Sequence, residues 1–460
     1  MFIDLYNDMP GALFEPFYRI TKQLFANYKQ TFDAWEDGGI KGIVIGRMRL
    51  GETGKMSLAW QPDPETYRAR GIEPPPKQDI DPEKEKTLHS LLDDAAGRGW
   101  KVQIFVSHPP TGPLPFEEDP WGAIRSVTGV QDMMNAFPQA SGHIIDGPGE
   151  GHYELAFIHG GEVFETTEGQ RKRWALFGKD VAKIERGVRH IRERFHNLTR
   201  SLVRYHAPGG VLDGMKLFDI NDDVLYWLNV RKEMAVGSMK ATREEMDKLN
   251  RKIHLGGIPR AVLFSALTAQ DYRALTKYFD YTFPKHYFWH RGFDGMYGTL
   301  YRWVQRIGTW NPELTEADCF AVVKAWFGIK LPGIERLHDF DRVGFPDEFF
   351  SEIVCGETRR ALAAADGDTD KIIPWISTGQ APHCGDPMPS HDLYRILKAT
   401  KDAGATRFLF HSINDLGGPE WSIISEMCGN AWDNDPRGYW PTPTEHPSSW
   451  NGGREVPDEP

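Results

Sequence analysis

The sequence predicts an α/β fold and, within that class, a single (β/α)8 TIM barrel. Apolar runs alternate with helix-like segments along the 460 residues, a pattern typical of βαβ units and a parallel sheet. Eight such runs are present, most followed by a helical segment, and eight parallel strands with crossover helices close into a barrel. An open doubly wound sheet is the alternative. It would need a Gly-rich nucleotide loop after the first strand, and DMPGAL is not one.

The expected strands are short and spread over the whole chain. They cover residues 2–6, 42–47, 101–107, 142–146, 260–265, 281–287, 371–378 and 407–412. Helical patterns fill most of the connections, over residues 15–35, 83–96, 171–205, 221–253, 271–278, 297–307, 316–326, 347–365 and 391–403. The long helical insertion between strands four and five offers a lid or a homodimer surface. We therefore expect one barrel domain over residues 1–432 and an irregular C-terminal tail over residues 433–460.

Composition excludes several classes of protein. With 40% hydrophobic and 26% charged residues, the chain is neither disordered nor fibrous. A net charge of −11 argues against a nucleic-acid partner or an anionic membrane surface. Its four cysteines lack metal-type spacing, and no apolar run approaches the roughly 18 residues of a membrane span. The first residues, MFIDLYNDMPG, do not resemble a signal peptide, so we expect a cytoplasmic protein unless a secretory leader has been trimmed.

Candidate functional residues follow from the barrel prediction, because barrel active sites form at the C-terminal ends of the strands. In strand order, the candidates are Asp8; Arg47 and Arg49; His108; Asp146, Glu150, His152 and Glu154; Ser265 and Thr268; Lys285, His286, His290, Arg291 and Asp294; His383 and Asp386; and His411, Asn414, Asp415 and Glu420. Charged groups are costly near an apolar barrel mouth unless they are used. Plainer roles exist for some: Asp146 as an acceptor for loop N–H groups, Asp294 in a turn, and Glu420 at a helix start.

Two carboxyl groups that flank a bond indicate glycoside hydrolysis. They lie about 5–5.5 Å apart when configuration is retained and about 6.5–9.5 Å apart when it is inverted. Carboxylates from strand four and from strands six to eight face each other across a barrel mouth. Nearby aromatic side chains would stack on sugar rings, namely Tyr153, Tyr287, Trp289, Tyr297 and Trp421.

Four segments resemble an uncharacterised bacterial branch of (β/α)8-barrel glycoside-hydrolase-like proteins. They read HIIDGPGEGHYE, PKHYFWHRGFDGMYGT, PWISTGQAPHCGDPM and FLFHSINDLGGPEW, and they run from the fourth strand to the eighth. The resemblance implies that Asp146 is similar to the nucleophile of several α-glycosidase families. Those families often take their general acid from the strand-six loop, where Asp294 stands. No Asn-Glu ends the fourth strand, so the acid and the stereochemical outcome stay open.

The predicted catalytic pair is Asp146 as nucleophile or base, with Asp294 as the first choice of acid, then Glu150 and Glu154. Asp294 comes from the far side of the mouth, and aromatic neighbours would raise the pKa of its carboxyl as an acid requires. His286 and His290 are substrate-binding residues or alternative acids, because imidazole titrates in the right range. The predicted substrate-binding set is completed by Asp8, Arg47, His108, His152, Glu154, Lys285, Arg291, His383, Asp386, His411 and Asn414.

Other readings of the same residues lead to different functions. A divalent-metal sugar isomerase or epimerase would draft Glu150, His152, Asp294, His383 and Asp386 as ligands. A metal amidohydrolase is disfavoured because strand one lacks a His-x-His motif. A non-catalytic carbohydrate-binding barrel would keep the aromatic residues without a working carboxyl pair. The leading prediction is a glycosidase without a cofactor or metal. Basic residues at the strand ends allow an acidic sugar such as a uronate or a sialate, although they also balance nearby carboxylates.

Overall fold

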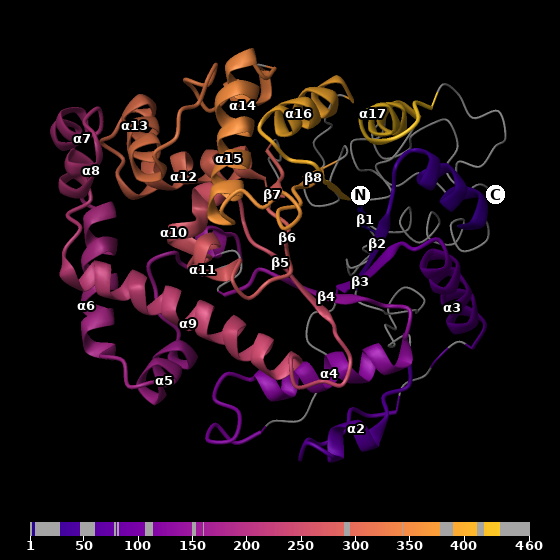
Figure 1. The fold of residues 1–460 in the computed structure, drawn as a ribbon. Helices are drawn as coiled ribbons and strands as arrows, with labels where there is room; N and C mark the ends of the chain where they lie inside the picture. Colours follow the sequence, from indigo (N-terminus) through magenta and orange to yellow (C-terminus); the bar gives the residue numbers. More distant parts are fainter. Residues whose placement is uncertain are drawn as a thin grey trace, which may run out of the picture.

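A central parallel sheet surrounded by helices forms the body of the molecule, so the predicted α/β fold is confirmed (Figure 1). The computed structural model describes residues 2–4, 28–46, 60–77, 80, 82–105, 114–149, 153–159, 161–288, 295–342, 344–377, 390–411 and 418–432. Its strands are β1 Phe2–Asp4, β2 Gly42–Gly46, β3 Lys101–Phe105, β4 Gly142–Asp146, β5 His254–Ile258, β6 Tyr281–Thr282, β7 Lys285–His286, β8 Trp375–Ser377 and β9 Leu409–His411.

Strand pairing follows chain order closely. Neighbouring strands run β6-β5-β4-β3-β2-β1-β9-β8-β7, and every pairing is parallel. Parallel pairing between consecutive strands requires a crossover connection, which the intervening helices provide. The first strand pairs with both β2 and β9, so residues 2–4 lie beside residues 409–411 within the sheet.

The two ends of this strand order, β6 and β7, belong to one extended segment that Pro284 interrupts. Proline has no backbone N–H to donate to a ladder, which splits the strand in two. On one side of the segment, the Phe283 N–H donates to the Gly257 carbonyl over 2.8 Å. On the other, the Ile373 N–H donates to the Thr282 carbonyl over 2.9 Å, and β7 pairs with β8. Residues 281–286 are therefore hydrogen-bonded on both edges.

Apolar side chains form an inner and an outer layer. The inner cluster is small and draws on nearly every strand, with Val44, Phe105, Ile144, Ile258, Phe283, Tyr287, Ile373, Trp375 and Leu409. The outer cluster is much larger and joins the other face of the strands to the helices. Because successive side chains of a strand point to opposite faces, each strand feeds both layers.

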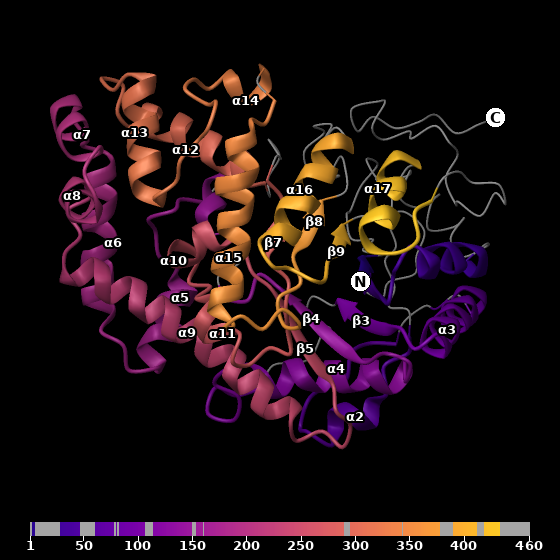
Figure 2. The ribbon, with the colours of Figure 1, turned by 45° about the horizontal axis from the view of Figure 1, so that its top comes forward.

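Helices cover the outside of the sheet, as two views of the ribbon show (Figures 1 and 2). Residues 28–37 are helical. The α-helices are α2 Pro64–Arg68, α3 Pro82–Gly97, α4 Ala123–Ala136, α5 Glu168–Leu176, α6 Val181–Phe195, α7 Arg200–His206, α8 Val211–Leu217, α9 Asp222–Met246, α10 Ser265–Thr268, α11 Tyr272–Leu275, α12 Met296–Trp310, α13 Glu316–Phe327, α14 Asp339–Arg342, α15 Cys355–Ala364, α16 Ser390–Asp402 and α17 Gly418–Cys428. Tighter 3-10 turns span η2 Tyr153–His159 and η3 Val262–Phe264, and a wider π-helical turn, η4 Phe349–Val354, precedes α15. Within the described ranges, no helix is long and apolar enough to cross a bilayer.

The predicted fifth strand over residues 260–265 is wrong. The strand lies six residues earlier, at His254–Ile258, and residues 262–264 form a 3-10 turn. Two consecutive glycines in HLGGI conceal this strand. A Cβ on Gly256 would lie 2.8 Å from the Phe283 ring, and one on Gly257 would lie 2.2 Å from the Phe279 ring. The glycines are needed because aromatic rings from the next segment press against the backbone. The predicted strand-five ends, Ser265 and Thr268, therefore lie in α10.

The expected helix over residues 171–205 is three helices. Each begins at a side chain that accepts a hydrogen bond from the first turn: Thr167 for α5, Asp180 for α6 and Thr199 for α7. Such residues favour helix starts because they satisfy N–H groups that have no intrahelical partner. The long helix α9, by contrast, runs unbroken close to the predicted range of 221–253.

The last described helix packs against the first. Gly38 lies so close to the Trp421 ring that a Cβ would come within 2.3 Å of it. Gly39 has a φ of +92° and abuts the Cys428 carbonyl, an arrangement that favours glycine. The Asn430 amide donates to Asp37 through both its backbone N–H, over 3.0 Å, and its side chain, over 2.8 Å. The C-terminal tail expected over residues 433–460 lies outside the described residues.

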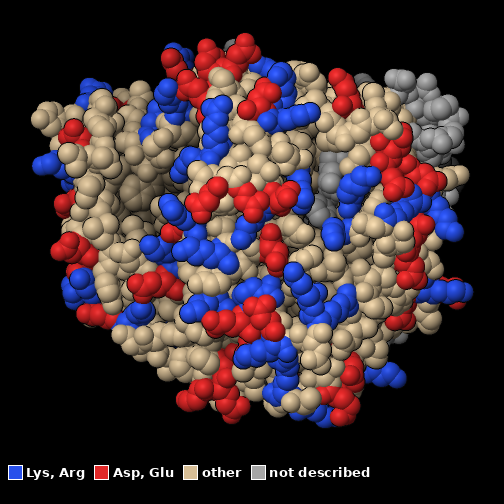
Figure 3. Space-filling model, in the orientation of Figure 1, with Lys and Arg blue, Asp and Glu red and all other residues tan. Residues whose placement is uncertain are grey.

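Acidic and basic side chains are interspersed over the face of the molecule in Figure 3. Neither sign of charge forms a broad continuous area on this face. Recognition of a charged ligand would therefore need a local arrangement of side chains, such as a lined cavity.

Candidate active site

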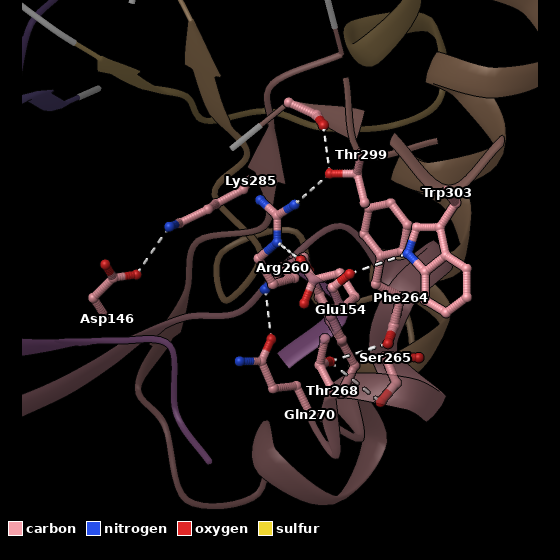
Figure 4. Close-up of polar contacts among 12 residues, drawn as sticks. Asp146, Glu154, Arg260, Phe264, Ser265, Thr268, Gln270, Lys285, Thr299 and Trp303 are labelled. Atoms are coloured by element: carbon pink, nitrogen blue, oxygen red, sulfur yellow. Dashed lines mark hydrogen bonds and ion pairs between the residues drawn. The ribbon is translucent and has the colours of Figure 1, made fainter. Parts of the chain in front are cut away.

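An ion pair joins the ends of β4 and β7. The Lys285 ammonium lies 3.1 Å from Oδ1 of Asp146. The lysine side chain is 3% exposed and the aspartate side chain is 34% exposed, so water reaches the carboxylate but hardly reaches the amine. Figure 4 shows the two side chains extending toward each other from different segments.

Because side chains alternate between the two faces of a strand, Asp146 and Lys285 both point to the inner face of the sheet. Ile144 belongs to the inner cluster, and Asp146 lies two residues later on the same face of β4. Lys285 lies between Phe283 and Tyr287, which also belong to the inner cluster. Its ammonium is 5.8 Å from the centre of the Trp375 ring, within reach of a cation–π interaction. The pair therefore lies at the C-terminal end of the inner layer.

A second ion pair, between Arg260 and Glu154, lies close by and is sealed from solvent. The side chains are 2% and 0% exposed, and Nε of Arg260 donates to Oε1 of Glu154 (Figure 4). Glu154 comes from η2, after β4, and Arg260 follows β5. The structure places Glu154, a predicted substrate-binding residue and third-choice acid, in this buried pair.

A dense set of hydrogen bonds fixes Arg260 and Glu154. The Arg260 backbone N–H donates to Gln270 over 2.7 Å, and its guanidinium donates to Oγ1 of Thr299 over 3.2 Å. The Trp303 indole N–H donates to the Glu154 carbonyl over 3.0 Å. These bonds hold the Arg260 side chain and the Glu154 backbone, whereas Oε2 of Glu154 is buried without a hydrogen-bond partner among the described residues. The carboxylate therefore depends on Arg260 for its stability. These contacts tie the segment after β4 to α10–α12.

Beside Asp146 lies a cavity of about 540 Å³. Ligand sites typically enclose about 300–1,000 Å³. The cavity is bounded by the outer face of β4, by the loop after it and by α4, α5 and α9. Its lining includes Trp121, Arg125, His143, Ile145, Asp146, Tyr153, Arg173, Trp174, Arg231 and Ser238. Gly149, with a φ of +99°, brings the loop so near to α9 that a Cβ would lie 2.9 Å from the Ala235 methyl. Close approach of this loop shapes the cavity rim.

Positive charge predominates in the cavity lining. Three arginines line it, whereas Asp146 is its one lining carboxylate among the described residues. Arg231 is buried, donates to the Leu267 carbonyl over 2.7 Å, and lies 3.8 Å from the centre of the Tyr153 ring. The Arg173 side chain is open to solvent, yet desolvation by the surrounding protein lowers the pKa of its guanidinium. Arginine nevertheless keeps its charge.

His286 faces the opposite side of β7 from Lys285. Its ring is fully buried, 5.1 Å from the Phe288 ring, in the outer layer. Burial lowers the pKa of this imidazole to about 3, because an apolar site disfavours the charged form. The structure therefore keeps His286, a predicted alternative acid and substrate-binding residue, neutral and away from the inner face.

Most of the other predicted site residues lie outside the described residues. They are Asp8, Arg47, Arg49, His108, Glu150, His152, His290, Arg291, Asp294, His383, Asp386, Asn414 and Asp415. His411 ends β9, where only its backbone is described. The structure therefore brings together Asp146 and Lys285 from the predicted set. Glu420 lies in the first turn of α17, as its plainer role predicted.

Three of the predicted sugar-stacking aromatics are core residues instead. Tyr287 is 2% exposed, Tyr297 is 1% exposed and Trp421 is fully buried, so none presents a face to a ligand. Tyr153 does line the cavity, and Trp289 lies outside the described residues. Aromatic residues near strand ends supply packing area as readily as binding surface.

Sequence reasoning missed the cavity residues that helices contribute. Trp121 lies two residues before α4 and Arg125 lies in its first turn, and this helix was not predicted. Its apolar residues Val127, Val130, Met133 and Met134 recur at helical spacing and could have revealed it. Arg231 lies on α9 among many other charged residues, and no sequence pattern distinguishes it from them. Within the described ranges, no group of three or more His, Cys, Asp or Glu could hold a metal ion, and the alternative metal set lies outside them.

Comparison with solved structures returns proteins that break down carbohydrates. The chain is similar to the glycoside hydrolase domain of PgaB (BpsB) from Bordetella bronchiseptica, at 10% identity and a TM-score of 0.44, covering 94% of this chain and 99% of that one. It is also similar to a β-galactosidase from Marinomonas ef1 (11%, TM-score 0.43, 93% and 59%) and to the catalytic domain of a β-amylase from Paenibacillus polymyxa (10%, TM-score 0.40, 93% and 97%). No protein-family model and no curated protein matches the sequence.

Proposed function

We propose that the sheet is a closed (β/α)8 barrel with its active site at the ends of β4 and β7. Hydrogen bonds on both edges of residues 281–286, to β5 and to the segment leading into β8, support closure. So does an inner apolar cluster drawn from strands all around the sheet. With β6 and β7 counted as one interrupted strand, the strand number matches a TIM barrel, whose interior is filled by side chains.

Within this barrel, the chain acts as a glycoside hydrolase with Asp146 as its nucleophile or base. The observation that carries the proposal is the position of Asp146. It is a partly exposed carboxylate on the inner face of a strand end, held by a buried lysine beside a lined cavity. The ammonium engages Oδ1, which leaves Oδ2 to face a substrate. Positioning of this kind is what a carboxylate needs to act repeatedly in one geometry.

Chemistry at this site requires a second carboxyl group. As a nucleophile, Asp146 would bond to the anomeric carbon while the bond from that carbon to the glycosidic oxygen breaks. The second carboxyl would give its proton to the departing oxygen, and water would then release the sugar from Asp146. As a base, Asp146 would instead take a proton from the attacking water. Asp294 and Glu150 are the acids we propose, in that order.

The decisive experiment combines a substrate screen with the Asp146→Asn variant. Aryl glycosides of neutral and acidic sugars are tested first, and NMR of the first-formed anomer distinguishes retention from inversion. On any substrate found, Asp146→Asn should lower turnover at least a hundredfold, by roughly the contribution of an essential acid or base. Its unfolding free energy should change by no more than about 1–2 kcal/mol, because the side chain is partly solvated.

A matched control is Asp402→Asn. Asp402 is an ion-paired carboxylate, 2.7 Å from the Lys398 ammonium, on the exposed face of α16. This variant should keep wild-type turnover. Near-wild-type turnover by Asp146→Asn would contradict the assignment. Binding of sugars without any turnover by the wild-type protein would favour the carbohydrate-binding barrel.

Metal removal separates the hydrolase from the isomerase alternative. Hydrolysis by a carboxyl pair needs no metal, so activity should survive EDTA and dialysis into metal-free buffer. Loss of activity on chelation, with recovery on adding a divalent cation, would favour a metal-dependent isomerase or epimerase.

A further inference from the structure

The cavity beside Asp146 contains two cationic groups that lack carboxylate partners. Arg125 of α4 and Arg173 of α5 both line it, and across the ranges that the structure describes neither forms an ion pair. Their neighbours on α5 behave differently: Arg171 lies 3.7 Å from a carboxylate oxygen of Glu185, and Lys172 lies 2.6 Å from one of Glu168. Arg125 and Arg173, which form no ion pair among the described residues, thus both lie at the cavity.

Like charges gathered around a partly enclosed space raise its positive potential. Arg231 adds a third guanidinium at the inner wall. Surrounding protein already lowers the pKa of Arg173, so part of the hydration of its charge has been lost. An anion placed between these groups would recover that loss, because oxyanions accept paired hydrogen bonds from the planar guanidinium.

The remaining walls are suited to a sugar ring. Trp121, which is partly exposed, lies beside the arginines, and Arg173 lies 5.9 Å from the centre of its ring, whereas Trp174 is 3% exposed and packs in the core. Indole faces cover the apolar faces of pyranose rings. Two small residues of α9 face this region. Ser238 lines the cavity. Gly237 leaves room for the Trp121 ring, because a Cβ on Gly237 would lie only 2.4 Å from that ring.

We propose that this cavity is a subsite for an anionic sugar, whose carboxylate or phosphate group is bound by Arg125 and Arg173. The cavity lies against the outer face of β4, which contributes His143 and Ile145, and Asp146 reaches its edge from the end of that strand. The assignment of the anion to a sugar rests on the hydrolase function proposed above. The affinity of the cavity for an oxyanion does not depend on that function. Oxyanion binding and glycoside hydrolysis are therefore tested by separate measurements.

Binding is measured by calorimetry on the full chain with three probes: glucuronate, glucose 6-phosphate and neutral glucose. The acidic probe that is the natural match should bind most tightly, and glucose should bind at least about tenfold more weakly, since hydrogen bonds to charged groups are the strong ones. The two acidic probes distinguish a carboxylate subsite from a phosphate subsite. Affinity should fall as salt is raised, because ions screen the attraction.

Two variants and a control locate the binding site. Arg125→Gln and Arg173→Gln should each weaken binding of the acidic probe about tenfold. Lys172→Gln removes the same charge from α5 at a position that does not line the cavity, and it should leave affinity unchanged within about twofold. Circular dichroism checks that each variant is folded. Since Arg173 is exposed, its substitution gives a readout even if Arg125→Gln fails to fold.

Each outcome bears on one proposal or the other. Absence of acidic-probe binding to the wild-type protein, or equal binding by Arg173→Gln and wild type, overturns the subsite. Arginine-dependent binding together with no glycoside cleavage supports the subsite and overturns the hydrolase. Cleavage of neutral glycosides without binding of either acidic probe supports the hydrolase and overturns the subsite.

Discussion

Two carboxylate–cation pairs lie within the same part of the molecule, and their surroundings differ. Asp146 and Lys285 join two strand ends, with the carboxylate partly open beside a cavity. Glu154 and Arg260 are closed off completely and surrounded by hydrogen bonds. Residue types alone do not separate a pair with an accessible carboxylate from a fully buried one. Access of water and ligand to the carboxylate does.

Removing Arg260 should have the largest effect on stability. Arg260→Ala leaves the Glu154 carboxylate buried without its partner, so the free energy of unfolding should fall by about 3–5 kcal/mol. Urea denaturation measures this change. Lys172→Ala is the control: it breaks an ion pair whose side chains are 72% and 70% exposed, which should cost less than about 0.5 kcal/mol. A loss below about 1 kcal/mol in Arg260→Ala would mean that the buried pair is not structural.

Protonation of His286 should have the second-largest effect on stability. Its folded pKa of about 3 lies below the ordinary value of 6.5, so the unfolded chain binds this proton first as pH falls. Stability from the neutral ring is complete above pH 6.5 and is lost as pH falls toward 3. Between pH 7.5 and 5, the wild type should lose roughly 2 kcal/mol more than His286→Leu. Parallel pH profiles for the two proteins would contradict the buried, neutral state.

Substituting Lys285 should have the smallest effect on stability and a clear effect on activity. In Lys285→Met, Asp146 loses its partner but still reaches water, so unfolding free energy should fall by only about 1–2 kcal/mol, between the values for buried and surface pairs. Turnover should fall more than tenfold because the carboxylate is no longer held. Lys172→Met, which changes an exposed lysine, should alter neither quantity. A stability loss as large as that of Arg260→Ala would remove the distinction between the two pairs.

Local patterns predicted the strands that carry continuous apolar sequence. The fourth strand was predicted with the bounds that the structure has, because GHIID alternates toward two buried layers and then stops at Gly147-Pro148. The fifth strand was misplaced because its glycines make room for the rings of Phe279 and Phe283, which lie more than twenty residues further along the chain. RAVLF, in contrast, has strand-like composition but follows Pro259 and turns at once into η3. Non-local packing, not local preference, decided both cases.

The residues of the candidate site also fall into two groups: those that local sequence predicts and those that depend on non-local packing. Asp146 and Lys285 were named from the sequence because both end or follow strands. Their mutual contact depends on where residues 281–286 pair in the sheet, which no local pattern encodes. Arg125, Arg173 and Arg231 come from helices, and a search restricted to strand ends cannot find them. Glu154 and His286 were overestimated for a related reason: sequence position gives proximity to a strand end but not burial.

The contact between Asp37 and Asn430 has a consequence for how the protein is made. These residues are 393 positions apart, and beside them Trp421 and Cys428 close against Gly38 and Gly39. During synthesis, the first strand and helix emerge from the ribosome long before their last neighbours exist. Asp37 meets Asn430 only after the intervening chain has been made, so this contact forms late and closes a very long loop. Joining the termini and opening the chain at a surface connection elsewhere would remove that delay, and such a circular permutant should form this contact earlier than the natural order allows.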